Sequence, residues 1–313
     1  MKRKIIKLGS ATLVTSLPAK WVRQYGLKAG DYLEATEQKK DLVLSTSKTT
    51  ATPEKVLDCR KLDTRLMREY LIAAYVLGYH TIEILHDATI QNYRGKSSVK
   101  TTDFLQEKIG EFIGMEIVEQ HETRTVIKEL TDISPEELEN TLRRIFYLLK
   151  ELGTTIYDAL KKQNRTSLEG ADARVQNVKR FQNYFLRVLN KHGYTDFSKT
   201  NFMFVVADNL RLVNTTYRVI AELALETKKK YSQTSLLAFE LTNNAFAKFV
   251  ELFYNYKPET AIALIELFEK TKEAIDGDKN PPAQDNRMYA NLYAIHAFIQ
   301  HSLRVSFGMQ LQN

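Results

Sequence analysis

The chain has 313 residues, of which 43% are hydrophobic and 27% are charged, a composition that is ordinary for a globular protein of two or three domains. It carries 45 Lys and Arg residues against 38 Asp and Glu residues, a formal net charge of +7. A single cysteine excludes an intramolecular disulfide, and the absence of a stretch of ~20 apolar residues excludes a membrane span. No secretory signal is recognised at the N-terminus, so we expect a cytoplasmic protein without membrane insertion.

Positive charge is concentrated at the N-terminus. Residues 1–50 contain ten basic and four acidic residues, and the first thirty contain no Asp or Glu. Nearly all of the excess charge therefore belongs to one small module. Such a concentration is typical of a surface that binds a polyanion, most often nucleic acid, whereas the simpler alternative is a solvated face.

The N-terminal module, residues 1–46, is predicted to contain two pairs of short strands around one helix. Pro18 stands in the first turn of the helix, where its missing N–H is not needed, and Gly26 ends the helix. The expected elements are strands at 5–8, 12–15, 32–35 and 41–44 and a helix at 18–25.

This order of elements resembles the swapped-hairpin domain of the AbrB/MazE/SpoVT family. The residues that carry the resemblance are Lys7-Leu8-Gly9, Thr15-Ser16-Leu17-Pro18-Ala19-Lys20-Trp21-Val22 and Gly26-Leu27-Lys28-Ala29-Gly30-Asp31. About 40 residues bury too little core to be stable alone, and the family solves this by interleaving two chains. The resemblance therefore implies a homodimer with a swapped-hairpin β-barrel that binds double-stranded DNA.

The DNA-binding residues are expected to be of two kinds. Basic side chains would neutralise backbone phosphates, and hydroxyl side chains would donate hydrogen bonds to phosphates or bases. The first group is Lys2, Arg3, Lys4, Lys7, Lys20 and Arg23, and the second is Ser10, Thr12 and Thr15.

A polar linker at 46–54 leads to a predicted small α+β domain at 55–130. Its expected order is strand, helix, strand, helix, strand, strand, with a polar loop at 94–101. Arg60 follows Cys59 and could lower the pKa of its thiol, but a structural thiol at the end of a strand is the favoured interpretation because no base is assigned. The histidines of this domain lack metal-ligand spacing and are expected to be packed or exposed: His80, His86 and His121.

From residue 133 onward the apolar residues recur at spacings of three and four, which predicts amphipathic helices. Ser134 and Pro135 are a helix-start signal. The expected helices lie at about 135–160, 171–190, 201–225, 235–253, 258–277 and 285–307. Six long helices in two triplets predict an all-α domain at 133–313 made of a pair of three-helix bundles. The fold class is then multidomain α+β.

Two tandem three-helix bundles resemble PhoU, the negative regulator of phosphate uptake. The fragment Tyr217-Arg218-Val219-Ile220-Ala221-Glu222 adds to the likeness, and together with the N-terminal module the chain resembles the PhoU-type regulators of archaea. The resemblance implies a DNA-binding transcriptional regulator of phosphate uptake. Its helical half would bind a small effector or dock on a phosphate transporter component. The alternative is an adaptor that controls a phosphate transporter through protein contacts, with the N-terminal module serving only to dimerise.

The resemblance fails at the acidic metal motifs that PhoU proteins carry on their helices. Asp208 has no second acid four residues later, and Arg211 adds a positive charge beside it. At the positions of the second helix where carboxylates would be needed, the side chains are amides or carry positive charge: Gln176, Asn177, Lys179, Arg180 and Gln182. The remaining acidic cluster, Glu266, Glu269 and Glu273, is expected to be a solvated face. We therefore expect no metal or other cofactor, and no catalytic motif indicates an enzyme.

Overall fold

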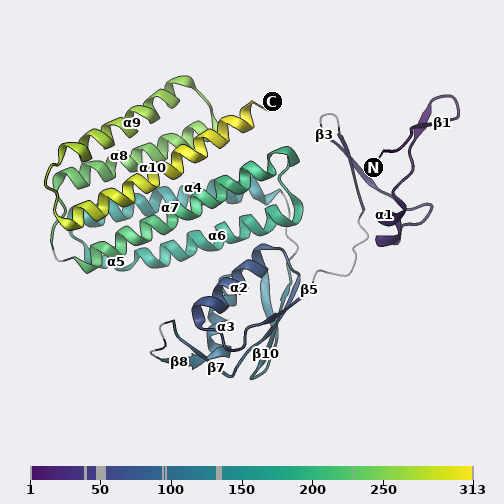
Figure 1. Cartoon of the computed structure of the whole chain (residues 1–313), viewed down its shortest axis with the longest axis horizontal. Helices are drawn as coiled ribbons and strands as arrows, with labels where there is room; N and C mark the ends of the chain where they lie inside the picture. Colours follow the sequence, from purple (N-terminus) through teal and green to yellow (C-terminus); the bar gives the residue numbers. More distant parts are fainter. Residues whose placement is uncertain are drawn as a thin grey trace. The chain divides into compact units, whose positions relative to one another are not determined.

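The computed structural model describes residues 2–38, 41–46, 54–93, 95, 97–131, 136–227 and 229–311. The chain divides into two compact units, Met1–Glu54 and Lys55–Asn313. It is an α+β protein with small sheets and a helical C-terminal region (Figure 1). The described residues leave out most of the predicted linker at 46–54 and the helix-start residues Ser134 and Pro135.

The N-terminal unit contains two antiparallel hairpins and one short helix, as the sequence predicts. Ile6 pairs with Val14 in the first hairpin, and Glu34 pairs with Ser45 in the second. Gly9 adopts a φ of 72° in the first turn, a left-handed conformation that glycine accepts without strain. The elements are β1 (Ile6–Leu8), β2 (Thr12–Val14), α1 (Ala19–Gln24), β3 (Glu34–Gln38) and β4 (Asp41–Ser45).

The predicted closed β-barrel is not present in the single chain. Each hairpin of the N-terminal unit is a separate two-stranded sheet among the residues that the structure describes. Two strands expose most of their surface and are marginal in water on their own. Closure of a barrel would need strands from a second copy, so the swapped dimer stays a prediction.

The second unit begins with a four-stranded sheet in the order β5-β6-β10-β9. Strand β10 runs antiparallel to both of its neighbours. The first helix of this unit begins after Asp63, whose side chain caps it by accepting a hydrogen bond from the Leu66 N–H at 2.8 Å. A second small hairpin, β7–β8, occupies part of the predicted polar loop. The elements are β5 (Glu54–Asp58), α2 (Thr64–Val76), β6 (Thr81–Leu85), β7 (Thr89–Gln91), β8 (Ser98–Lys100), α3 (Thr101–Ile109), β9 (Met115–Gln120) and β10 (Arg124–Glu129).

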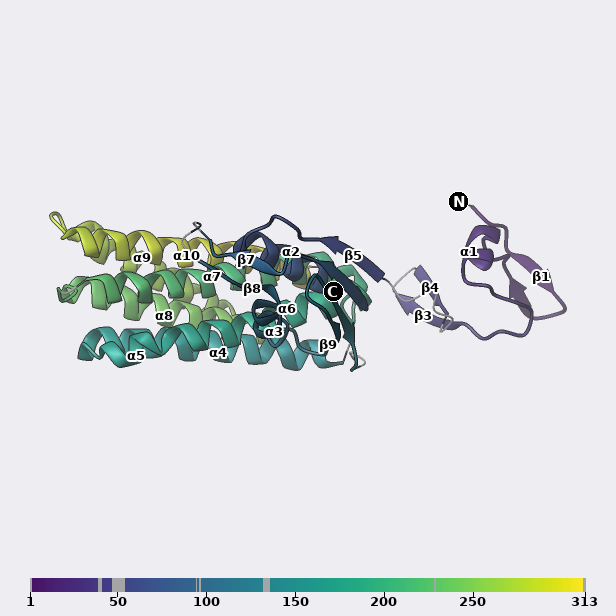
Figure 2. The ribbon, with the colours of Figure 1, turned by 90° about the horizontal axis from the view of Figure 1, so that it is seen from below.

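The rest of this unit is helical, and its six long helices lie side by side (Figure 2). They are α4 (Glu137–Lys162), α6 (Ala171–His192), α7 (Thr200–Glu226), α8 (Gln233–Tyr254), α9 (Pro258–Gly277) and α10 (Ala283–Gln310), with the short α5 (Arg165–Glu169) between the first two. The two predicted triplets share one hydrophobic core, because α4 packs against α8 and α7 packs against α10. None of the described helices has the length and apolar composition needed to cross a bilayer.

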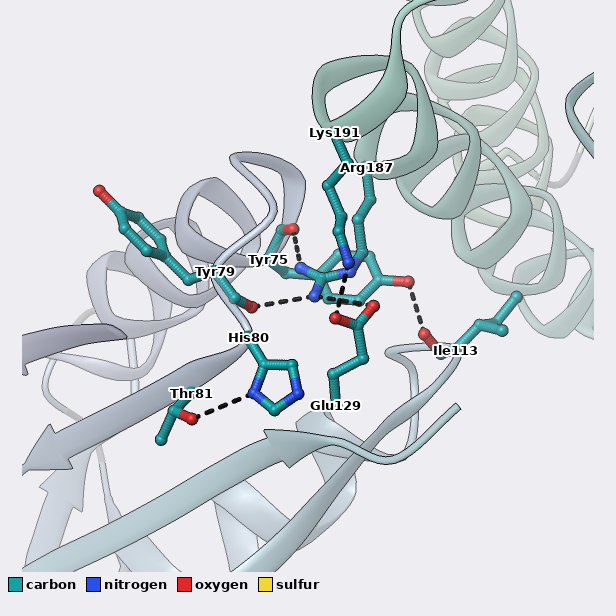
Figure 3. Close-up of polar contacts among 8 residues, drawn as sticks. All are labelled: Tyr75, Tyr79, His80, Thr81, Ile113, Glu129, Arg187 and Lys191. Atoms are coloured by element: carbon teal, nitrogen blue, oxygen red, sulfur yellow. Dashed lines mark hydrogen bonds and ion pairs between the residues drawn. The ribbon is translucent and has the colours of Figure 1, made fainter. Parts of the chain in front are cut away.

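A buried ionic cluster joins the α+β part of this unit to α6 (Figure 3). Arg187 has no exposed surface and donates to the carbonyl oxygens of Tyr75 at 2.5 Å and Tyr79 at 2.9 Å, at the end of α2. Glu129 on β10 lies 3.2 Å from the Arg187 guanidinium and 2.7 Å from Lys191 Nζ. The carbonyl groups at the C-terminal end of a helix lack partners within the helix. The Arg187 guanidinium of α6 supplies such partners and so stabilises the packing of α2 against α6.

Candidate nucleic-acid interface

The described residues of the N-terminal unit form no core of their own. Between residues 2 and 46, none of those whose burial the structure describes is buried. Large apolar side chains are instead exposed, up to 93% for Tyr32, and they include Ile5, Ile6, Leu8, Leu13 and Leu42. Exposed apolar surface of this kind in a segment of regular structure is typical of a binding interface.

The β1–β2 hairpin has two chemically different faces. Paired residues of an antiparallel ladder share a face, and successive residues alternate between faces. Lys7 pairs with Leu13, whereas Leu8 pairs with Thr12 and Ile6 with Val14. Lys7 and Thr12 therefore project from opposite faces, and Thr12 shares its face with three apolar side chains.

All nine residues predicted to contact DNA are exposed. Lys20 and Arg23 lie three positions apart on α1 and so share one side of that helix. Within the described residues, no carboxylate forms an ion pair with Lys2, Lys4, Lys7, Lys20 or Arg23. The positive charge of these side chains is thus available to an external anion.

The other predicted contacts lie at the base of the first hairpin. The Arg3 guanidinium donates to Ser16 Oγ at 3.5 Å, and Thr15 Oγ1 donates to the Lys4 carbonyl at 3.5 Å. Ser10 lies in the β1–β2 turn. The single chain thus places the predicted residues on the hairpin, at its base and on α1, and does not gather them on one face.

Cys59 is a structural thiol. It is 1% exposed, and burial together with the Asp58 charge raises its pKa to about 11. The Arg60 guanidinium, which could have activated the thiol, instead contacts Asp58 through Nη2 and Oδ2 at 2.6 Å. A thiol with this pKa is protonated at neutral pH and is a poor nucleophile.

The described residues contain no group of three or more His, Cys, Asp or Glu side chains that could hold a metal ion. Asp208 pairs with Arg211 at 3.4 Å, and Glu266 lies 3.9 Å from Lys270 on the exposed side of α9. His86 is buried beside Thr125, with Nε2 and Oγ1 3.0 Å apart, and His121 is exposed. Asp208, Glu266 and His86 thus have partners within the protein.

No protein-family model, curated protein or solved structure matches this chain.

Proposed function

We propose that the protein is a dimeric, DNA-binding transcriptional regulator with a helical region that senses an effector or docks on a partner. The observation that carries this proposal is the basic N-terminal unit, which has an acid-free start. Among the described residues, Lys7, Lys20 and Arg23 form no ion pair with a carboxylate. The resemblance to PhoU-type regulators makes phosphate uptake the process that we expect to be controlled.

Dimerisation is supported by the apolar face of the first hairpin. Ile6, Leu8 and Val14 share this face, and Ile6 and Leu8 are both more than half exposed. Interleaving the hairpins of two chains would bury these side chains and pair the free strand edges, which both favour association. The opposite face, with Lys7, would remain in solvent.

DNA binding is supported by the cations that this dimer would leave exposed. Each chain contributes Lys7 from the hairpin and Lys20 and Arg23 from α1, none of them paired with a carboxylate in the described residues. Two copies related by a two-fold axis would present two such sets to the phosphates of one duplex.

The test is a DNA-binding titration at several salt concentrations. If about six phosphates or more are neutralised, affinity should fall about a thousandfold between 50 and 200 mM salt. The triple variant Lys4→Ala, Lys7→Ala and Arg23→Ala should bind more weakly and show a shallower dependence on salt. Random duplex DNA serves as the probe, since phosphate contacts do not need a specific sequence.

A matched control removes the same charge from the second unit. The variant Lys162→Ala, Lys272→Ala and Lys279→Ala changes exposed lysines there and should leave both affinity and salt slope unchanged. Equal slopes for wild type and the N-terminal triple variant would overturn the proposal. The N-terminal unit would then serve for dimerisation alone, as in an adaptor protein.

A further inference from the structure

A small basic cavity lies between α2, α6 and α7, all within the second unit. Its volume is about 210 Å³. Four cationic side chains line it, Arg68 from α2, Lys179 from α6 and Arg211 and Arg218 from α7, against a single carboxylate, Glu69. Three helices that are distant in sequence thus converge on one positively charged site.

Two buried amides line the same cavity. Gln182 is 0% exposed and Asn214 is 3% exposed. The Asn214 amide donates to the Val175 carbonyl at 3.1 Å and to Gln182 Oε1 at 3.4 Å. Two polar atoms of these amides then have no hydrogen-bond partner among the described residues: the donor Gln182 Nε2 and the acceptor Asn214 Oδ1. The donor Arg68 Nε also has none there. Buried polar groups are seldom left unpaired unless a ligand or water meets them.

Lys179 is the cation of this cavity that lacks a partner. Arg68 pairs with Glu69 at 2.9 Å, whereas Arg211 and Arg218 each lie 3.4 Å from an acid on their own helix. No carboxylate in the described part of the chain forms an ion pair with Lys179. Desolvation, and then the nearby Arg68 charge, lower the pKa of Lys179. A bound anion would offset both effects through its attraction to the ammonium group.

We propose that this cavity binds a small oxyanion that also carries a hydroxyl group, namely hydrogen phosphate or a small phosphate monoester with a free alcohol hydroxyl, such as glycerol 3-phosphate. Anionic oxygens would accept hydrogen bonds from Lys179 Nζ, Gln182 Nε2 and Arg68 Nε, and the hydroxyl would donate to Asn214 Oδ1. Sulfate has no proton to donate at neutral pH and would leave that acceptor unpaired. The volume is below the ~300 Å³ of ordinary ligand pockets, which favours a small ligand over a nucleotide.

Calorimetric titration of the full-length protein tests this proposal. Sodium phosphate, glycerol 3-phosphate and sodium sulfate are compared at equal ionic strength. Phosphate or glycerol 3-phosphate should bind at least tenfold more tightly than sulfate, because an unpaired buried acceptor carries that order of penalty. The tighter of the two phosphate ligands identifies whether the ligand is the free anion or a monoester.

Variants on α6 locate the binding to this cavity. Lys179→Gln should weaken phosphate binding tenfold or more, whereas Arg174→Gln, an exposed side chain outside the cavity, should leave it unchanged. Without ligand, Lys179→Gln should unfold at the same temperature as wild type or higher, because an uncompensated, half-buried charge is removed. Equal binding of sulfate and phosphate would overturn the requirement for a hydroxyl group. Absence of phosphate binding, or no effect of Lys179→Gln on it, would show that this cavity binds no anion. DNA binding by the N-terminal unit and phosphate binding in this cavity are measured in separate experiments. A negative result in one experiment therefore leaves the other proposal unaffected.

Discussion

His296 on α10 is a buried histidine held in its neutral form. It is 5% exposed, its ring lies against Phe268, and its Nε2 is 3.0 Å from Thr242 Oγ1. The Thr242 hydroxyl already donates to the Ala238 carbonyl, so the His296 N–H donates to the hydroxyl oxygen. Burial lowers the pKa of His296 from an ordinary value of 6.5 to about 4.

This shift predicts that acid destabilises the protein. Below pH 6.5 the unfolded chain takes up a proton at His296, whereas the folded protein does so only near pH 4. The contribution of this group to the free energy of unfolding is therefore complete above pH 6.5 and decreases as the pH falls toward 4. Between pH 7 and pH 5, the free energy of unfolding should fall by about 2 kcal/mol. Urea unfolding at the two pH values should show a smaller difference for His296→Gln. The exposed control, His121→Gln, should behave as wild type, and an unchanged pH dependence in His296→Gln would contradict the assignment.

Arg187 shows what a single residue does for the architecture. It is one of several basic residues of the predicted second helix, and its sequence neighbours do not distinguish it from exposed ones. In the structure it is fully buried, and its partners are the Tyr75 carbonyl of α2, the Tyr79 carbonyl just after that helix and the Glu129 carboxylate. Only the docking of α2 on α6 explains why a charged side chain stands there.

Among the elements, α4, α7 and α8 approach one another closely at Gly153. A Cβ atom at this position would lie 2.6 Å from Asn243 Oδ1 and 2.7 Å from the Tyr217 hydroxyl. These two groups are hydrogen-bonded to each other at 2.8 Å, and Tyr217 is buried. Glycine is therefore required here by helix packing, although it weakens the isolated helix.

Gly153→Ala should lower the free energy of unfolding. Alanine gains about 1 kcal/mol in helix preference, but overpacking costs about 1–3 kcal/mol and disruption of the Tyr217–Asn243 hydrogen bond a similar amount. We expect a net loss of about 1–5 kcal/mol in the free energy of unfolding measured with urea. Gly277→Ala, at the end of α9 with no atom within 4 Å of the new Cβ, should be neutral or slightly stabilising. A stable Gly153→Ala protein would show that the helices move apart easily.

For the whole molecule, the two units differ in whether they can stand alone. Residues Lys55–Asn313 contain both hydrophobic cores, one under the four-stranded sheet and one among the six long helices. The N-terminal unit has no buried residue in its described part. Association of the full chain is therefore expected to depend on the N-terminal unit.

Light scattering at micromolar concentration tests this expectation. The full-length protein should have the mass of a dimer, and a truncated protein of residues 55–313 should be a folded monomer, because it keeps its cores but loses the exposed apolar hairpins. Equal oligomeric states for both proteins would remove the N-terminal unit as the dimer interface. A monomeric full-length protein would exclude the swapped-hairpin dimer.

The sequence alone determined the long helices and the distribution of charge. Apolar spacing of three and four predicted six long helices within a few residues of their ends, since that period reflects local helix geometry. Proline and glycine marked helix ends such as Pro258 and Gly277 for the same local reason. The concentration of basic residues at the N-terminus likewise needs no folded structure to be recognised.

The tertiary structure decided what depends on residues far apart in the chain. It joined the helices in one core and raised the pKa of Cys59 by burial. It also brought Arg68 to the same cavity as Lys179 and Asn214, more than a hundred residues away. Periodicity and caps act within a turn or a strand, whereas burial, ion pairing and cavities arise only when separate elements pack, and no local pattern encodes which ones meet.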